Sequence, residues 1–318
     1  MSFYTLTNRL TKGFSNTVFH KDKEFLFFRF RTIRGRDMQL NLTNKYNGKR
    51  AFITGGGGAL GRAFALLLAR DGWSIGLTDI STNHLDVARK EITEAGGKCL
   101  TYVCDVSDKV AYKQAFDSFI KECQGIDLLI NNAGVGDGGL FGEYELEKWD
   151  WITGINQMGV IYGTHYAVEV MKKQRSGCIL IISSLAAVAC MPNMSMYNVT
   201  KAAVLALGES IYAELRPFNI HVAVALPEFF KSGIMQHARG DENAATIGRK
   251  KIEKASITAD EVAAYILHQT GKEAFYILHP LKARIAFRLI RWFPGIFLNS
   301  KFRQFIKKKW VRERLAKP

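Results

Sequence analysis

The sequence predicts an α/β fold built on a single doubly wound, parallel, seven-stranded sheet. Three observations lead to this prediction. Short β-branched or apolar runs alternate with longer helical patterns from residue 51 onward, which is typical of β-α-β units. The chain has 318 residues and is 47% hydrophobic, so it can bury a large core. A glycine-rich turn follows the first apolar run and opens the first helical pattern.

Seven runs are expected as strands. They are "RAFIT" (50–54), "SIGLTD" (74–79), "KCLTYVCD" (98–105), "DLLINNA" (127–133), "CILIISS" (178–184), "HVAVALP" (221–227) and "AFYILHP" (274–280). Amphipathic helices are expected between them. The stretch "LGRAFALLLARDG" is closed by Gly72, and "TADEVAAYILHQTG" starts with the capping-box pair Thr258 and Glu261 and ends at Gly271.

The basic charge of the chain lies at its two ends. The net charge is +15, with 11 Lys and Arg against 3 Asp and Glu in residues 1–50, and 12 against 1 in residues 281–318. Residues 51–280 are left with a net charge of −4. We therefore divide the chain into a basic N-terminal extension (1–47), a central globular domain (48–280) and a basic amphipathic C-terminal extension (281–318). No recognition motif accompanies the basic ends, so we expect no nucleic-acid partner.

Cysteine and hydropathy patterns favour an intracellular protein. The five cysteines are odd in number and show no C-x-x-C spacing, which argues against a disulfide framework or a zinc site. His84, His165 and His221 have no partners at metal-ligand spacing, so we expect no metal. No run of about 18 apolar residues predicts a spanning helix. We expect a cytoplasmic or peripherally membrane-associated protein, and the basic, hydroxyl-rich start of the chain leaves organelle targeting open.

The stretch "ITGGGGALGRAF" places a glycine-rich turn at the start of a helix, where the backbone can approach a pyrophosphate. A loose turn is the alternative. Asp79 ends the second expected strand, where a carboxylate can accept hydrogen bonds from a ribose diol and repel a 2′-phosphate. An acid at a helix N-terminus is the alternative. The two features predict a Rossmann-type site for NAD, with NADP as the alternative because Arg62 lies one turn into the helix.

A tyrosine stands four residues before a lysine in "SMYNVTKAA". On a helix, Tyr197 and Lys201 would share one face, and the ammonium can bias the phenol toward its ionised form. The pair therefore predicts a proton donor or acceptor. An ordinary surface pair is the alternative that this fragment leaves open.

With these residues placed, residues 48–280 resemble the short-chain dehydrogenase/reductase family, which makes this segment a dinucleotide-binding catalytic domain. The family's T-G-x-x-x-G-x-G motif starts at Thr54, and Ala59 stands in place of its middle glycine. The resemblance implies cofactor contacts from Thr54, Gly55, Gly57, Gly58, Ala59, Leu60, Gly61, Asp79, Asp105, Val106, Asn132, Ala133, Gly134, Tyr197, Lys201, Pro227 and Ser232.

Further family motifs follow in order along the chain. "CDVSD" supplies Asp105 and Val106 as adenine contacts, and "NNAG" (131–134) shapes the end of the fourth strand. "GINQMGV" supplies Asn156, and "GCILIISSLAA" supplies Ser184. After the sixth strand the chain departs from the family. Glu228 replaces the glycine that usually follows Pro227, and Ser232 stands in the position of a threonine.

The resemblance implies four catalytic residues: Asn156, Ser184, Tyr197 and Lys201. Ser184 lies thirteen residues before Tyr197, the family's interval between the two. Tyr197 would exchange a proton with the substrate oxygen, which Ser184 would polarise. Lys201 would lower the pKa of Tyr197 and hold the cofactor ribose, and Asn156 would hold a water that links Lys201 to solvent. The alternatives are a strand-end hydroxyl for Ser184 and a structural polar contact for Asn156.

The C-terminal extension interleaves Lys and Arg with Leu, Ile, Phe and Trp, as interfacial helices do. Leu281, Ile285, Leu289 and Trp292 share one helical face, Pro294 and Gly295 break the run, and Phe302, Phe305, Ile306 and Trp310 form a second face beside Lys307 to Lys309. The N-terminal "KEFLFFRFRTIRGR" is similar. Residues 281–318 are therefore expected to contact a membrane surface. Packing on the catalytic domain or across a dimer is the alternative.

The sequence predicts an NAD(P)-dependent alcohol dehydrogenase or ketone reductase. The tails suggest a small lipophilic substrate, such as a sterol, a retinoid or a long-chain lipid. An acyl-thioester reductase is the alternative among enzymes, and a catalytically silent cofactor-binding scaffold is the alternative from another class. The resemblance also implies a homodimer or homotetramer.

Overall fold

The computed structural model describes residues 42, 45–236, 238–239, 241–307 and 311–312. The N-terminal stretch "KEFLFFRFRTIRGR" and residues 308–310 lie outside them. Residues 38–318 group into one compact unit that includes the C-terminal helices. The division of the chain at residues 47 and 280 stays a proposal. Among the described residues, no helix combines the length and apolar character that crossing a bilayer requires.

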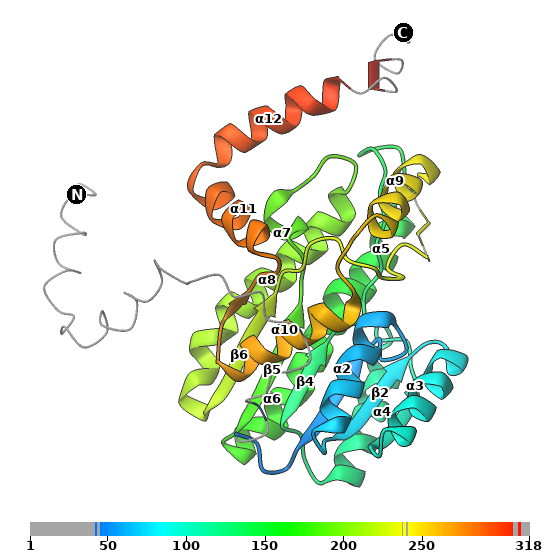
Figure 1. Ribbon diagram of the computed structural model, residues 1–318, viewed down its shortest axis with the longest axis vertical. Helices are drawn as coiled ribbons and strands as arrows, with labels where there is room; N and C mark the ends of the chain where they lie inside the picture. Colours follow the sequence, from blue (N-terminus) through cyan, green and yellow to red (C-terminus); the bar gives the residue numbers. More distant parts are fainter. Residues whose placement is uncertain (1–41, 43–44, 237, 240, 308–310, 313–318) are drawn as a thin grey trace, which may run out of the picture. The chain divides into compact units, whose positions relative to one another are not determined.

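The described residues form a seven-stranded, all-parallel sheet with the order β3-β2-β1-β4-β5-β6-β7 (Figure 1). Its strands are β1 (Arg50–Thr54), β2 (Ser74–Asp79), β3 (Lys98–Val103), β4 (Leu128–Asn131), β5 (Gly177–Ile182), β6 (Ile220–Ala225) and β7 (Tyr276–Ile277). All seven predicted strands are confirmed. Five of them end two or three residues earlier than predicted, where the chain leaves the sheet for the loops at its carboxyl edge.

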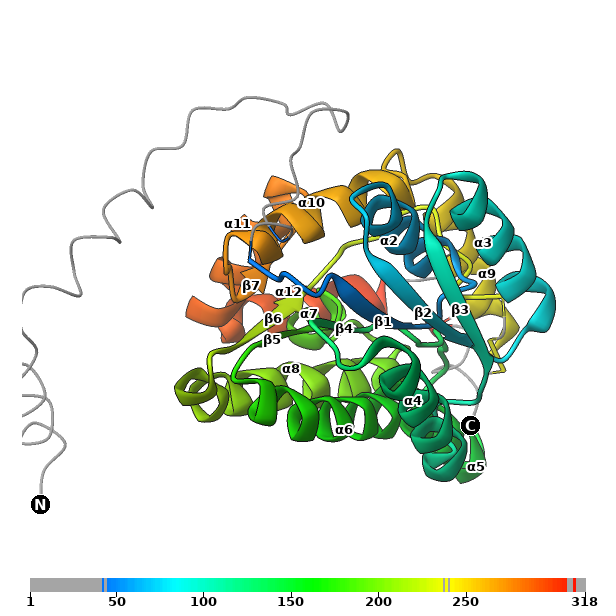
Figure 2. The same ribbon diagram turned by 90° about the horizontal axis from the view of Figure 1, so that it is seen from below.

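Helices cover both faces of the sheet (Figure 2). They are α2 (Ala59–Arg70), α3 (Thr82–Glu94), α4 (Lys109–Cys123), α5 (Leu146–Thr153), α6 (Gly159–Gln174), α7 (Ala186–Ala189), α8 (Ser195–Leu215), α9 (Glu242–Glu253), α10 (Ala259–Gly271), α11 (Leu281–Trp292) and α12 (Pro294–Ile306). One core lies between the sheet and α2, α3 and α10, and a second lies between the sheet and α4, α6 and α8. The fold is therefore doubly wound, as predicted.

Local sequence signals set the ends of two helices as expected. Thr258 Oγ1 accepts from the Glu261 backbone N–H at 3.2 Å, and the Thr258 N–H donates to the Glu261 carboxylate at 2.9 Å. This capping box satisfies two donors at the start of α10. Helix α2 ends at Arg70, and Gly72 takes the turn that follows with φ of 80°. A side chain there would be strained.

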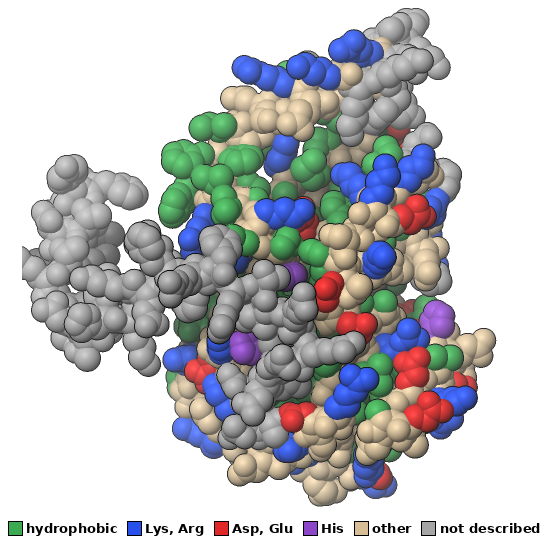
Figure 3. Space-filling model, viewed as in Figure 1, with side chains coloured by type: hydrophobic (Ala, Val, Ile, Leu, Met, Phe, Trp, Pro, Cys, Tyr) green, Lys and Arg blue, Asp and Glu red, His purple; other side chains and the backbone are tan. Residues whose placement is uncertain are grey.

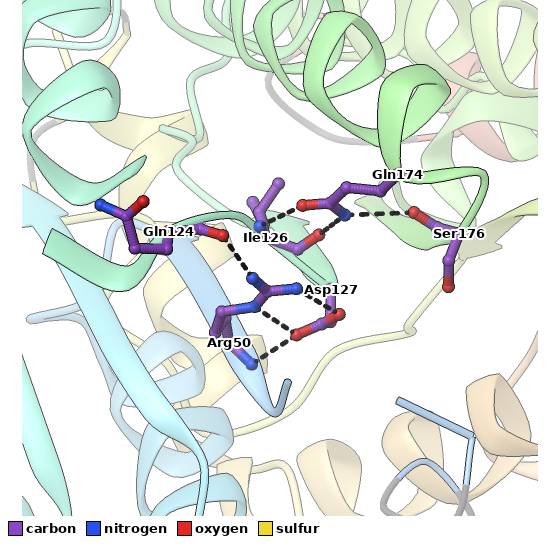
Figure 4. A network of polar contacts seen from close by, with 6 residues as sticks. All are labelled: Arg50, Gln124, Ile126, Asp127, Gln174 and Ser176. Atoms are coloured by element: carbon purple, nitrogen blue, oxygen red, sulfur yellow. Dashed lines mark hydrogen bonds and ion pairs between the residues drawn. The ribbon is translucent and has the colours of Figure 1, made fainter. Parts of the chain in front are cut away.

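A polar cluster joins strands at the amino-terminal edge of the sheet (Figure 4). The Arg50 guanidinium donates to both oxygens of Asp127, at 2.8 and 3.0 Å. The Gln174 amide accepts from the Ile126 N–H at 3.1 Å and donates to its carbonyl at 2.7 Å. These bonds tie β1, β4 and the end of α6 together, opposite the carboxyl ends of the strands. The cluster therefore stabilises the amino-terminal edge of the sheet. The predicted site residues lie at the opposite, carboxyl edge.

Candidate active site

The predicted site residues meet at the carboxyl edge of the sheet. The strand order changes direction between β1 and β4, and ligands of open α/β sheets bind outside such a switch point. The loops that follow β1, β3, β4, β5 and β6 carry about half of the residues that the sequence singled out, and strand ends and helices carry the others. Topology thus brings together residues that are up to 178 positions apart, from Thr54 to Ser232.

The glycine-rich loop between β1 and α2 is held by hydrogen bonds to the end of β4. Thr54 Oγ1 accepts from the backbone N–H groups of Asn132 and Ala133, each at 3.0 Å. The Asn132 amide donates to the carbonyls of Thr54 and Gly55 at 2.9 and 3.1 Å. Gly55 has φ of 62°, the left-handed conformation that suits glycine. Thr54, Asn132 and Ala133 therefore shape the loop.

The loop tolerates alanine at the family's middle glycine but has no room at its last glycine. Ala59 is the first residue of α2 and is exposed. A Cβ at Gly61 would lie 2.2 Å from the Gly55 carbonyl oxygen, so α2 can approach the loop closely only with glycine there. Gly58 is exposed and extended, with φ of −73°. The backbone at Gly57 and Gly58 thus stands at the helix start where a pyrophosphate would bind.

Asp79 lies beside this loop. One carboxylate oxygen accepts from the Gly57 N–H at 3.1 Å, and the other accepts from the Ser81 N–H at 3.0 Å. The carboxylate has further acceptor capacity for two ribose hydroxyls. Asp105 is exposed and caps its own turn, with its carboxylate accepting from the Ser107 N–H at 2.9 Å, and Val106 is buried next to it. The loop and Asp79 fit the ribose and pyrophosphate of a dinucleotide.

Asn156 lies in a π-helical turn (Gly154–Met158) between α5 and α6 and is fully buried. Its Oδ1 accepts from the Val135 N–H at 2.8 Å, and its Nδ2 donates to the Val135 carbonyl at 2.9 Å and to Thr200 Oγ1 at 3.2 Å. Single π-helical turns are frequent at functional sites. Asn156 thereby connects the loop after β4 to helix α8.

Tyr197 and Lys201 are buried on one side of α8, as their spacing predicted. The Lys201 ammonium donates to the Ile182 carbonyl at 3.0 Å and lies 5.8 Å from the centre of the Tyr197 ring. A Cβ on Gly134 would lie 3.3 Å from Lys201 Nζ and 3.2 Å from Asn156 Oδ1. Glycine at 134 therefore lets the backbone pass close to both groups. The alternative of an ordinary surface pair does not fit this burial.

Burial dominates the ionisation of the pair. It raises the pKa of the Tyr197 phenol to about 12, against the opposing effect of a hydrogen bond with Ser184. It also lowers the pKa of the Lys201 ammonium to about 8. Both shifts favour the neutral form of each group, as expected in a low-dielectric surrounding. In the protein alone, burial thus works against the lowering of the tyrosine pKa that the sequence predicted from Lys201.

Two further hydroxyls support the site and were not predicted. Thr200 is fully buried, accepts from Asn156 and donates to the Tyr197 carbonyl at 3.0 Å. The Ser183 hydroxyl donates to the Lys201 carbonyl at 2.8 Å. Both are neighbours in sequence of predicted residues, but Asn156, which donates to Thr200, and Lys201, which accepts from Ser183, lie in other elements. Only the packing of α8 against β5 and the π-helical turn reveals these contacts.

The segment after β6 closes the site on one side. The Pro227 carbonyl accepts from the Leu185 N–H at 3.1 Å, which ties it to the residue that follows Ser184. The Glu228 carboxylate pairs with Lys282 of α11 at 3.2 Å. Ser232 is half-buried farther along the same loop. The residue that departs from the family pattern thus contacts the C-terminal extension.

The fold and this constellation define an oxidoreductase class, and comparison with known proteins agrees. A family model described as short chain dehydrogenase matches residues 49–243. The chain belongs to the short-chain dehydrogenase/reductase family and is an oxidoreductase of that family.

Two relatives and one solved structure illustrate the similarity. The chain is 30% identical over 233 residues to 3-oxoacyl-[acyl-carrier-protein] reductase FabG of Thermotoga maritima, covering 73% of this chain and 94% of the relative. It is 33% identical over 178 residues to cyclopentanol dehydrogenase of a Comamonas species, covering 56% and 71%. A short-chain dehydrogenase/reductase of Burkholderia phymatum in complex with NAD aligns with a TM-score of 0.73 and 28% identity, covering 77% of this chain and 93% of that one.

Proposed function

We propose that this protein oxidises a secondary alcohol, or reduces the matching ketone, with NAD as its cofactor. The observation that carries the proposal is the buried arrangement of Tyr197 and Lys201 on α8 beside Ser184 and Asn156. The Burkholderia phymatum neighbour was solved with NAD, and the cyclopentanol dehydrogenase is named for an alcohol, which supports both halves of the proposal.

The residues that would hold the cofactor are those predicted from the sequence. The loop from Gly55 to Gly61 would face the pyrophosphate, Asp79 the adenosine ribose, and Asp105 with Val106 the adenine. Asp79 supports NAD over NADP, because its carboxylate would repel a 2′-phosphate. When bound, the nicotinamide accepts or donates the hydride.

Tyr197 would move the proton. In the oxidising direction its phenolate takes the hydroxyl proton of the substrate, and in the reducing direction its hydroxyl gives that proton back. Ser184 would hold the substrate oxygen, since its hydroxyl is placed to lower the pKa of Tyr197. Because burial raises the tyrosine pKa, the phenolate needs nearby positive charge. Lys201 would supply it together with the oxidised cofactor.

Asn156 would complete a path for the proton. Its Oδ1 accepts from Val135 and keeps a second lone pair. Both this oxygen and Lys201 Nζ approach the same backbone at Gly134. A water between them could accept a proton from Lys201 and pass it toward solvent, as the resemblance implied.

The surroundings of the site support a lipophilic substrate. Four large apolar side chains are exposed in the segments that would wall the substrate: Phe141 and Leu146 after β4, Met191 before α8 and Phe229 after β6. Exposed apolar side chains in such segments can contact an apolar ligand. We propose a sterol, retinoid or long-chain lipid ketone. An acyl-thioester reductase is the second candidate, supported by the name of the Thermotoga maritima relative.

Two proposals concern partners. We propose a homodimer or homotetramer formed through the helices that carry the fourth- and fifth-strand connections, as the family resemblance implied. We also propose that residues 281–318 contact a membrane surface, which would bring the site to a lipophilic substrate.

Titration of the purified full chain with NADH and NADPH, followed by cofactor fluorescence, tests the proposed function. Lipophilic ketones are then added and oxidation of the reduced cofactor is followed. We expect tighter binding of NADH and turnover of at least one long-chain or sterol ketone. Binding of neither nucleotide would overturn the proposal in favour of a silent scaffold. Product analysis separates a ketone reductase from an acyl-thioester reductase.

A further inference from the structure

Helix α11 is anchored to the protein body by one face. Ala283 and Phe287 are only 1% and 7% exposed, and Phe287 belongs to the core beneath α4, α6 and α8. The Arg291 guanidinium lies 4.9 Å from the centre of the Phe287 ring and pairs with Glu209 of α8 at 2.5 Å. A chain cut at residue 280 would lose this cover. The function of the extension is therefore tested by surface substitutions in the full-length chain.

The remaining surface of α11 and α12 is apolar and exposed. Figure 3 shows hydrophobic side chains gathered where α11 meets α12, with Lys and Arg side chains along α12. Eight large apolar residues between 39% and 69% exposed make up this surface, which we call the C-terminal apolar surface: Leu281, Ile285, Leu289, Trp292, Phe293, Ile296, Leu298 and Phe302. The predicted face of Leu281, Ile285, Leu289 and Trp292 thus points outward. An apolar patch of this kind marks an interaction site.

Charge identifies the partner of this surface. Residues 281–307 contain seven Lys and Arg and no Asp or Glu. A second copy docked through the same surface would bring like charges together, which costs free energy. The N-terminal residues 1–41 carry eight Lys and Arg against three Asp and Glu, so they also match this surface poorly. An anionic lipid bilayer satisfies both the apolar rings and the cations.

The helices that carry the C-terminal apolar surface also contact the segments that follow β5 and β6, beside the catalytic residues. Helix α11 packs on α7, which starts two residues after Ser184, and the Lys301 ammonium donates to the Ala189 carbonyl at the end of α7. Lys282 pairs with Glu228 directly after Pro227. The extension thus contacts the segments that follow β5 and β6, at the edge of the sheet where Tyr197 lies.

We propose that α11 and α12 dock on an anionic bilayer through the C-terminal apolar surface, and that this docking places the substrate entrance at the membrane. This proposal specifies which residues make the membrane contact proposed above. The part about the substrate entrance rests on the proposed lipophilic substrate. Apolar side chains at the turn between α11 and α12 enter the headgroup region, while the flanking cations face the lipid phosphates.

Vesicle flotation of the full chain tests the docking. Vesicles of phosphatidylcholine with phosphatidylglycerol are compared with phosphatidylcholine alone, at low and high salt. We expect the protein to bind the anionic vesicles and this binding to weaken at high salt. Each cation near the bilayer contributes about 1 kcal/mol, so screening one cation should weaken binding about fivefold. The double variant Trp292→Glu, Ile296→Glu should lose at least about tenfold in binding, because two exposed apolar contacts become anions. Val110→Glu on α4, which is 60% exposed, is the matched control and should bind as the wild type does.

Three outcomes would overturn the docking: no vesicle binding by the full chain, equal binding by the double variant, or loss of binding by the control as well. Light scattering decides whether a second copy covers the surface. A drop in mass of the double variant without lipid would assign the surface to self-association and reject the bilayer. Unchanged NADH binding shows that the variant is folded.

The entrance is tested by comparing a long-chain ketone held in anionic vesicles with a short water-soluble ketone. We expect the double variant to lose turnover of the vesicle-held ketone and to keep that of the soluble one. Equal loss on both, or on neither, would refute the entrance. If no ketone is turned over by the wild type, the proposed reaction fails while the flotation result still decides the docking.

Discussion

Gly61 is expected to be irreplaceable in the cofactor loop, whereas Gly58 is not. An added Cβ at Gly61 would lie 2.2 Å from the Gly55 carbonyl oxygen and 2.9 Å from the Asn132 amide nitrogen. The first of these is backbone, so either α2 or the loop must shift by about 1 Å to restore van der Waals contact. At Gly58 the nearest atom is again the Gly55 oxygen, but at 3.4 Å, which is an ordinary contact.

Gly61→Ala should therefore destabilise the protein by about 1–3 kcal/mol, the usual range for overpacking a close contact. In a domain of this size that lowers Tm by about 2–12 °C. The displaced loop should also lose at least one hydrogen bond to the cofactor phosphates, which weakens NADH binding at least about tenfold. Gly58→Ala, the matched control, should lose no more than about 1 kcal/mol of stability, the usual cost of alanine at a helix N-cap, and should keep the NADH affinity of the wild type.

Thermal unfolding by circular dichroism and NADH titration measure the two effects. A Gly61→Ala variant with wild-type Tm and wild-type NADH affinity would refute the steric reasoning. Equal loss of stability in both variants would show that glycine is needed along the whole loop, and that the close approach of Gly61 to Gly55 is not the cause.

Four further predictions concern the site and the opposite edge of the sheet. Tyr197→Phe should lower kcat by about 10²–10⁴-fold and leave the Kd of NADH unchanged, and activity within tenfold of the wild type would remove Tyr197 from its role. The pKa of Lys201 falls from 10.5 to about 8 on folding, so between these values the unfolded chain holds more protons. The free energy of unfolding should rise by about 2 kcal/mol from pH 7 to pH 9.5, and urea titrations of Lys201→Met should lack this rise. Asp79→Ala should raise the ratio of kcat/KM for NADP over NAD at least about tenfold, since a charged acceptor is lost, and an unchanged ratio would show that another residue selects the cofactor. Asp127→Ala should cost about 2–3 kcal/mol in urea unfolding, less than for a fully buried pair because the Arg50 side chain is 20% exposed, and a change in NADH affinity would contradict its purely structural role.

Much of the fold could be predicted because its signals are local. Apolar runs of strand length, a capping box at Thr258 and a glycine turn after "RAFIT" each depend on a few neighbouring residues. Five strands were predicted too long at their carboxyl ends. There the chain still contains apolar or hydroxyl residues, but the regular strand has ended, as after Ile182 of β5, although the Ser183 N–H still donates to the Ala225 carbonyl at 2.9 Å.

The catalytic residues could be predicted because their spacing is fixed by one helix and one strand-to-helix connection. The residues that support them could not be predicted. Thr200, Ser183 and Val135 contact the site through elements that are distant in sequence, and the π-helical turn around Asn156 leaves no mark in "GINQMGV".

The sequence by itself determined the order of strands and helices, the family and the place of Tyr197 and Lys201 on one helix. Only the tertiary structure decided that burial favours the neutral form of both groups, because desolvation depends on what packs around them. It also decided that Phe287 anchors α11 while Leu281, Ile285, Leu289 and Trp292 face outward. A helical pattern shows which residues share a face, but which face meets the core is settled by packing.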